Sequence, residues 1–398
     1  MSKKNFDIYL DLGASKIRVA GFDTIENNQI FFLENNCLTS LKTNLLDLSF
    51  TDKILEKTIL EIEKKTGEYL NSINLMLDSP DALSISLSVS KKNEKKFLEK
   101  EDIEYLIQDA KQEVLSAYPN KSIIHIVTNN FKVNNVTYDS LPLNVECNKF
   151  SIDIVFICFP KVIIENLEKL FSKHQISIDN FICTSYAKSF NYKEHFNEFN
   201  QIAFLDIGYE KTSVIFYEKE KIKFFDVLSI GGHHITKDIS KVLNLNIELS
   251  EKIKLNLNKD IIFSDNKNNK DIFKKEFLDT IKEKDLSFDL IKKIIFARIE
   301  ETLNLSFKTI KKNQFSDLNN ELKIILIGQG SKILDNKYID IRETTPLVEE
   351  IDFFEESISN ICQSGLKLLN GINKQEVVIV PKKLEKKGLF ERLFYFFK

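Results

Sequence analysis

The sequence predicts an α/β protein built from two similar halves. Apolar segments with the periodicity of strands alternate with segments of helical periodicity. One short pattern occurs twice, near the start of each half. A chain of 398 residues also exceeds what a single hydrophobic core usually organises, so we expect two to four subdomains.

The repeated pattern is an apolar strand that ends in Asp-x-Gly, a short polar turn and a second apolar strand. It occupies residues 9–19 and 204–214. Backbone N–H groups in such a turn form a concavity that attracts anions, and glycine allows a close approach. The carboxylates of Asp11 and Asp206 would repel bare phosphate, so we expect hydrated Mg²⁺ between protein and phosphate. One such turn is commonly structural, whereas two in register predict loops that bind a nucleotide's phosphates from both sides.

The other elements follow from hydrophobic periodicity. In the first half we expect, in chain order, helix 47–66, strand 74–77, strand 83–89, helix 100–115, strands 123–128, 131–133 and 150–159, helix 162–173 and strand 179–184. The piece between about residues 83 and 160 is self-contained, which indicates an insertion. In the second half we expect three strands within 201–229, helix 235–243, a disordered polar loop at 264–270, helix 290–311 and strand 322–327.

The last of these strands runs into Gly328-Gln329-Gly330-Ser331. A strand that ends in small residues offers a flat backbone surface on which an adenine ring could lie, although such a turn alone is a weak signal. Glu251 and Lys254 are three residues apart and share a helix face. They either form an ion pair on a solvated helix or contact the ribose or base of a nucleotide.

Composition excludes several classes of function. The net charge of −3 gives no basic field for nucleic acid, so we expect no nucleic-acid partner.

Five scattered cysteines suit free thiols in a reducing cytoplasm. The adjacent His233 and His234 point different ways, which disfavours a metal site. The chain opens without the pattern of a signal peptide, and its longest apolar run, 152–159, is too short to span a bilayer.

Together these features resemble the actin/Hsp70/sugar-kinase ATPase fold, and most closely the FtsA family of bacterial division proteins. Residues 11–16 are similar to the first phosphate motif of that family, and residues 231–254 to its Gly-Gly, Thr-x-Asp-Ile and Glu-x-Ile-Lys signature. Residues 295–301 match its Ile-x-x-Arg-x-x-Glu helix, and the insertion resembles the subdomain that distinguishes FtsA from actin.

The resemblance implies an actin-like ATPase fold, with two α/β halves around a nucleotide cleft, an FtsA-type inserted subdomain and a C-terminal amphipathic helix. The expected divisions are subdomain 1A at 1–82 and 161–198, 1C at 83–160, 2A at 199–235 and 321–372, 2B at 236–320, a linker at 373–385 and a membrane-targeting helix at 386–398.

It further implies binding of ATP and Mg²⁺, with Asp11 and Asp206 holding the metal through water. The other residues expected to bind nucleotide are Gly13, Ser15, Lys16, Gly208, Lys211, Thr212, Gly231, Gly232, Glu251, Lys254, Gly328, Gln329, Gly330 and Ser331. Tyr209-Glu210-Lys211 departs from the usual Gly-Gly-Thr of the family, and Gln329 replaces a glycine. The first departure narrows the second phosphate loop, so we expect at most weak ATPase activity, and we assign no catalytic residue.

The end of the chain has a composition typical of a membrane-surface helix. Apolar side chains gather on one face and charged ones on the other, with an excess of lysine and arginine. The expected lipid-facing residues are Leu389, Phe390, Leu393, Phe394, Phe396 and Phe397. A helix that packs on the protein's own core is the alternative. The resemblance favours a membrane anchor, because FtsA proteins carry their targeting helix at this place.

The function expected from the resemblance is that of a peripheral protein at the cytoplasmic face of the inner membrane, at the division site. It would polymerise, bind anionic lipid, anchor the FtsZ filaments of the Z ring through their C-terminal peptide and recruit later divisome membrane proteins. Arg298 is the residue expected to contact the FtsZ peptide, with an intrahelical ion pair as its alternative. A pilus-assembly scaffold and a small-molecule kinase of the same superfold are the competing functions, and no substrate-binding domain of the Hsp70 type follows residue 380.

Overall fold

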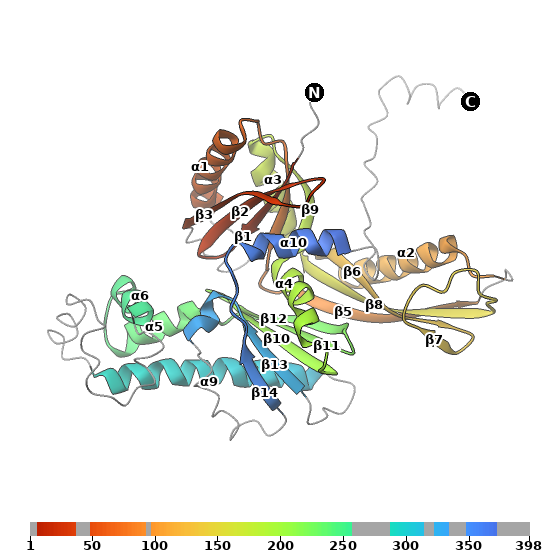
Figure 1. Cartoon of the computed structure of the whole chain (residues 1–398). Helices are drawn as coiled ribbons and strands as arrows, with labels where there is room; N and C mark the ends of the chain where they lie inside the picture. The colour runs from red at the N-terminus through yellow and green to blue at the C-terminus, as the bar shows by residue number, and fades with distance from the viewer. Residues whose placement is uncertain are drawn as a thin grey trace.

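The computed structural model describes residues 6–36, 48–92, 97–256, 287–313, 322–333 and 348–371. Two mixed β-sheets with helices between and around them form the fold (Figure 1). The fold is α/β and actin-like, as the sequence predicts. The predicted loop at 264–270 and the predicted membrane helix at 386–398 lie outside the described residues.

The first sheet has five strands in the order β3-β2-β1-β4-β9. Its strands are β1 (Phe6–Leu12), β2 (Lys16–Asp23), β3 (Gln29–Asn36), β4 (Ser72–Leu77) and β9 (Ser177–Cys183). β1 and β2 form an antiparallel hairpin, while β4 lies parallel to both β1 and β9. Parallel neighbours need crossover connections, which run through α1 (Leu48–Thr66) and α3 (Lys161–Lys173).

The second half is built in the same way. Its strands are β10 (Gln201–Ile207), β11 (Thr212–Glu218), β12 (Lys221–Leu228), β13 (Leu322–Ile327) and β14 (Val348–Phe353). β10 pairs antiparallel with β11 and parallel with β13, as β1 does with β2 and β4. The long α9 (Phe288–Asn313) lies along this part of the sheet, and α5 (Gly232–Val242) and α6 (Ile247–Asn256) lie beside the strands, with α5 packed against α9 and α6 (Figure 1). The repeated sequence pattern therefore corresponds to a repeated hairpin.

The inserted segment extends the second sheet to nine strands. Its elements are β5 (Leu83–Lys92), α2 (Lys100–Ala117), β6 (Lys121–Val133), β7 (Val136–Tyr138) and β8 (Lys149–Pro160). β5 joins β12 through the pairing of Leu83 with Asp226, and the Phe225 N–H donates to Ser84 Oγ at 2.7 Å. The sequence does not predict this junction, because it joins the insertion to the opposite half of the chain.

Two further helices lie between the sheets. α4 (Thr184–Tyr192) follows β9 and continues into a 3-10 turn, η2 (Lys193–Phe196), and α10 (Asn360–Gly371) packs beside α4 (Figure 1). Another 3-10 turn, η4 (Gln329–Ile333), follows β13. One apolar cluster contains residues of both sheets and of these helices, a second lies under α9, and a third fills the insertion.

The structure corrects the predicted elements at β6 and at α5, and it adds β3, β7, β14, α4 and α10, which were not predicted. β6 is one strand, whereas two strands separated by Asn129 and Asn130 were predicted. A shift of register absorbs these residues, and Asn129 Nδ2 donates to the Ile222 carbonyl at 2.6 Å. α5 begins at Gly232 rather than at Ile235, because the glycine pair itself forms the start of the helix.

No helix among the described residues is long and apolar enough to cross a membrane. Four cysteines, Cys147, Cys158, Cys183 and Cys362, are buried as free thiols, and Cys37 lies outside the described residues.

Candidate functional site: a cleft between two matching turns

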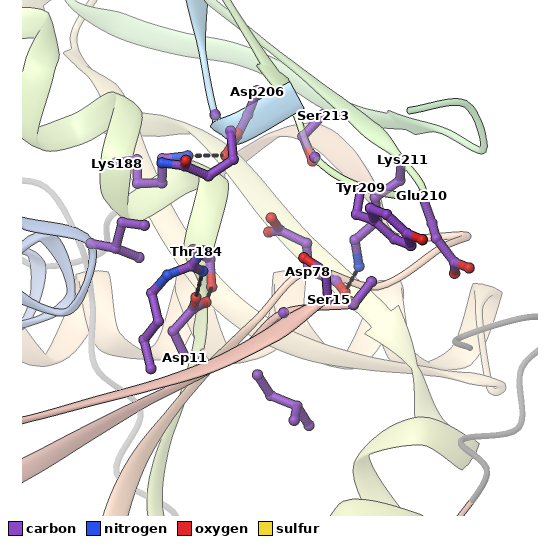
Figure 2. A pocket seen from close by; sticks show the side chains of 18 of the residues that line it. Asp11, Ser15, Asp78, Thr184, Lys188, Asp206, Tyr209, Glu210, Lys211 and Ser213 are labelled. Atoms are coloured by element: carbon purple, nitrogen blue, oxygen red, sulfur yellow. Dashed lines mark hydrogen bonds and ion pairs between the residues drawn. The ribbon is translucent and has the colours of Figure 1, made fainter. Parts of the chain in front are cut away.

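The two Asp-x-Gly turns line a common cleft of about 100 Å³. One wall comes from the turn between β1 and β2, the other from the turn between β10 and β11 (Figure 2). The end of β4, the start of α4 and the residues after β13 complete the cavity. The predicted residues that it brings together are Asp11, Gly13, Ser15, Asp206, Gly208, Lys211, Gly328 and Gln329.

The turns have the same backbone geometry. The Gly13 N–H donates to the Lys16 carbonyl at 3.0 Å, and the Gly208 N–H donates to the Lys211 carbonyl at 2.8 Å. A Cβ atom at Gly13 would lie 2.8 Å from the Lys16 carbonyl oxygen, and one at Gly208 would lie 3.1 Å from that of Lys211. Both turns therefore favour glycine for the same steric reason.

Each aspartate of the repeated pattern already has a buried cationic partner. Arg18 Nη1 lies 2.9 Å from Asp11 Oδ2, and the Thr184 hydroxyl donates to Asp11 Oδ1 at 3.0 Å. On the other wall, Lys188 Nζ lies 2.7 Å from Asp206 Oδ2 and 3.0 Å from Glu356 Oε1. Burial alone would lower the pKa of Lys188, but the two carboxylates outweigh it and raise that pKa, so Lys188 is charged.

A serine connects carboxyl groups from the two halves. Ser185 Oγ lies 2.5 Å from Asp78 Oδ2 and 2.8 Å from Asp206 Oδ2. One hydroxyl proton serves one acceptor, so the second contact needs a proton on a carboxyl group. Burial, reinforced by the charge of Asp206, raises the pKa of Asp78 although Lys211 opposes it. The raised pKa favours the neutral form of Asp78, whose carboxyl proton would satisfy the contact with Ser185.

The glycines expected at the nucleoside end approach the second turn closely. The Gly232 N–H donates to the Gly208 carbonyl at 2.9 Å, and a Cβ at Gly330 would lie 2.6 Å from the same oxygen. Gly328 has φ +89°, and a Cβ there would meet Asp206 Oδ1 at 2.3 Å. A second cavity of about 10 Å³ lies among Gly231, Gly232, Gly330 and nearby apolar side chains.

Glu251 and Lys254 lie beside this glycine turn. Their ion pair is 2.8 Å long, and Lys254 also donates to the Gly232 carbonyl at 3.1 Å. The ion pair of the first alternative is therefore present, although Lys254 is buried rather than solvated. Contact of the two residues with a nucleotide stays a prediction. Lys254 Nζ lies 5.7 Å from the centre of the Tyr209 ring, which stacks on His233 at 4.6 Å. Tyr209, which departs from the usual Gly-Gly-Thr of the family, thus has an aromatic and a cationic neighbour.

Three predicted nucleotide-binding side chains bond elsewhere in the structure. Lys16 pairs with Glu34 on β3. The Thr212 hydroxyl donates to the Ile230 carbonyl at 2.7 Å, and the Ser331 hydroxyl donates to the Gly328 carbonyl at 2.6 Å. None of the three is part of the lining of the cleft. Their contact with a nucleotide stays a prediction.

Sequence reasoning missed several polar residues that line the cleft, among them Arg18, Asp78, Thr184, Lys188, Ser213 and Glu356. It also missed Ser185, which contacts Asp78 and Asp206 beside the cleft. Asp78 directly follows β4, and Thr184 directly follows β9. Polar residues after buried parallel strands are a signal that could have revealed both, because such strand ends meet at one edge of a sheet.

The donor set does not fit a divalent ion held by Asp11 and Asp206. Both carboxylates are bonded to protein cations and hydroxyls. Within the described ranges, no group of three or more histidine, cysteine or acidic side chains is arranged to hold a metal ion. We therefore derive no role for Mg²⁺ at these two residues.

Comparisons with known proteins show which family the chain resembles. The family model for the cell division protein FtsA matches residues 203–374. Cell division protein FtsA of Streptococcus pneumoniae is 23% identical over 342 residues, which cover 84% of this chain and 72% of the relative. FtsA of Enterococcus faecalis is 25% identical over 261 residues, covering 64% of this chain and 59% of the relative. The matches thus leave between a quarter and two fifths of these relatives unaligned.

A solved structure supports the fold. The chain is similar to a protein of the PilM–PilN type IV pilus biogenesis complex, with a TM-score of 0.55 and 12% identity over 91% of this chain and 95% of that one. Identity at this level shows a shared fold alone. The sequence relatives, the family model over residues 203–374 and the two matching hairpins agree, and the chain is similar to the cell division proteins FtsA.

Proposed function

We propose that this protein binds ATP and polymerises at the cytoplasmic face of the plasma membrane. There it would anchor FtsZ filaments at the division site and recruit later divisome proteins. The observation that carries the ATP site is the pair of turns with identical backbone hydrogen bonds on opposite walls of one cleft. Two anion-attracting turns at this spacing suit a chain of phosphates.

The nucleotide would bind with its phosphates between the two turns and its nucleoside toward Gly328–Gly330. Gly231, Glu251 and Lys254 lie beside that end of the cleft. Tyr209, Glu210 and Lys211 crowd the second turn, and Lys211 Nζ contacts the Asp78 carbonyl across the cleft. This crowding supports weak hydrolysis rather than efficient turnover.

The proposed subdomains follow the boundaries predicted from the sequence. Residues 1–82 with 161–198, and 199–235 with 321–372, would form the two halves of the cleft. Residues 83–160 would form the inserted subdomain, and 236–320 the subdomain that receives the FtsZ peptide. The membrane contact would come from residues 386–398, whose composition suits an anionic lipid surface.

Arg298 is the residue proposed to bind the acidic FtsZ tail. The structure gives it two partners already: its Nε lies 2.5 Å from Asp238 Oδ2, and its Nη1 lies 2.6 Å from Glu301 Oε2. The intrahelical pair with Glu301, which was the alternative role, is therefore present. The side chain nevertheless remains about a quarter exposed, so it can still reach a partner's carboxylate.

The test measures the affinity of an FtsZ C-terminal peptide by fluorescence anisotropy. Arg298→Glu should weaken binding at least tenfold, because it places like charges together. Asp238→Asn removes the intramolecular partner but keeps the arginine, so this variant should bind with nearly unchanged affinity. Lys308→Glu, an exposed change on the same helix, controls for net charge. An equal loss of peptide affinity in Arg298→Glu and Asp238→Asn would show that Arg298 has a structural role. Unchanged peptide affinity in all three variants would refute the assignment.

A further inference from the structure

Two buried cations occupy the positions at which a divalent ion would be expected. Arg18 is 7% exposed and Lys188 is 3% exposed. They contact Asp11 and Asp206, the two carboxylates of the repeated pattern, at 2.9 and 2.7 Å. A hydrated ion between those carboxylates would have to compete with both ion pairs, in a site where unpaired buried charge is costly.

The carboxylates around the two cations are already paired within the protein. Arg18 faces Asp11 and Glu34, and Glu34 also pairs with Lys16. Lys188 faces Asp206 and Glu356, and burial raises the pKa of Glu356 even beside the lysine. Asp78 and Lys211 flank the site, with Asp78 bonded to Ser185. No carboxylate pair of the described cleft is thus left to attract a free metal ion.

The two cations keep hydrogen-bond donors for a ligand. An ammonium group has three N–H donors, and the contacts of Lys188 with Asp206 and Glu356 use two of them. A guanidinium group has five, and Arg18 uses Nε for Glu34 and Nη1 for Asp11. Side chains of this kind donate charge-assisted hydrogen bonds to phosphate without a metal ion.

Two further donors in the cleft point to an oxygen-rich ligand. Ser213 is 1% exposed and lines the cavity close to Asp206 (Figure 2), yet its hydroxyl has no hydrogen-bond partner among the described residues. Gln329 Nε2 is likewise buried without a partner in that part of the chain, and Gln329 also lines the cavity. Buried polar groups usually have partners, and both of these groups can donate to phosphate oxygens.

We propose that Arg18 and Lys188 take the place of the divalent cation, so that the cleft binds the triphosphate of ATP with an affinity that does not depend on Mg²⁺. This inference rests on the proposed ATP binding and adds which hydrogen-bond donors contact the phosphates. It also explains why both aspartates of the repeated pattern are present without being free for a metal: they hold the cations in position.

The test is calorimetric titration of the full chain with ATP, in excess Mg²⁺ and in EDTA. For the unchanged protein we expect dissociation constants within about threefold of each other. Lys188→Gln should create dependence on the metal, with ATP bound at least tenfold more weakly in EDTA than in Mg²⁺. Because this change frees Asp206, titration with MgCl₂ alone should show binding to the variant and none to the unchanged protein.

Lys323→Gln is the matched control. Lys323 is 2% exposed and pairs with Asp352 at 2.7 Å, but it lies outside the cleft, so its loss should leave the metal-independent affinity unchanged. If the unchanged protein binds ATP in Mg²⁺ but not in EDTA, the inference is overturned and the proposed ATP binding still holds. Absence of ATP binding in both conditions would overturn both. If Lys188→Gln does not fold, the ATP affinities of the unchanged protein in Mg²⁺ and in EDTA decide the question. Arg18→Gln is then the second variant.

Discussion

Replacement of Gly231 by alanine tests whether the packing of α5 against the second turn maintains the nucleotide cleft. A Cβ atom at this position would lie 2.6 Å from Lys211 N, 2.7 Å from the Gly208 carbonyl oxygen and 2.9 Å from Glu210 C. All three are backbone atoms, so no flexible side chain can move aside. The turn and the start of the helix would have to separate.

That separation would strain two hydrogen bonds. The Gly232 N–H donates to the Gly208 carbonyl at 2.9 Å, and the His233 N–H donates to the Tyr209 carbonyl at 2.6 Å. Overpacking costs about 1–3 kcal/mol, and each weakened hydrogen bond adds about 1 kcal/mol at most. We expect the free energy of unfolding to fall by about 2–4 kcal/mol. The ATP dissociation constant should rise at least tenfold, which corresponds to about 1.4 kcal/mol.

Gly67→Ala is the matched control for loss of stability. Gly67 has φ +70° with nothing near its added Cβ, so alanine there costs about 1–2 kcal/mol of backbone strain. Because this residue follows α1, far from the lining of the cleft, ATP affinity should not change. Urea unfolding and calorimetry would measure both quantities. The reasoning would be refuted if Gly231→Ala bound ATP within twofold of the unchanged protein. It would also be refuted if Gly67→Ala lost as much ATP affinity as Gly231→Ala.

Three further predictions concern the cleft, the membrane and pH. Asp11→Ala should weaken ATP binding at least tenfold, since Arg18 loses the carboxylate that positions it, and calorimetry showing unchanged affinity would exclude this role. Phe390→Glu with Phe394→Glu should abolish pelleting with anionic liposomes but leave ATP binding intact, and equal pelleting would show that the segment is no anchor. Burial, followed by the charge of Lys237, lowers the pKa of His233 from 6.5 to about 4. Its contribution to stability is therefore present above pH 6.5 and lost as the pH falls toward 4, on the order of 1 kcal/mol for this half-buried ring. Urea unfolding at pH 7 and pH 4.5 should show a smaller loss in His233→Asn, and equal losses would contradict the assignment.

The sequence alone predicted the features that depend on local chemistry. The segment Leu322–Ile327, apolar except for Lys323, forms a strand with the predicted bounds, and every residue in it is buried. The two Asp-x-Gly turns repeat one backbone hydrogen bond, since the same glycine and the same flanking strands impose the same geometry. The positions of Asp11, Gly13, Asp206 and Gly208 in one cleft followed from that repeat.

Only the tertiary structure decided which charges meet. Lys16 and Arg18 alternate on one strand, and the sequence favoured Lys16 as the phosphate ligand, whereas the structure pairs Lys16 with Glu34 and turns Arg18 to Asp11. Lys188 and Glu356 are distant in the chain and meet because the first half of α4 and the segment after β14 lie at the same cleft. Local periodicity and turn chemistry are encoded within a few residues, but the partner of a buried charge depends on how separate elements pack, and in this protein that packing supplies the cations of the cleft.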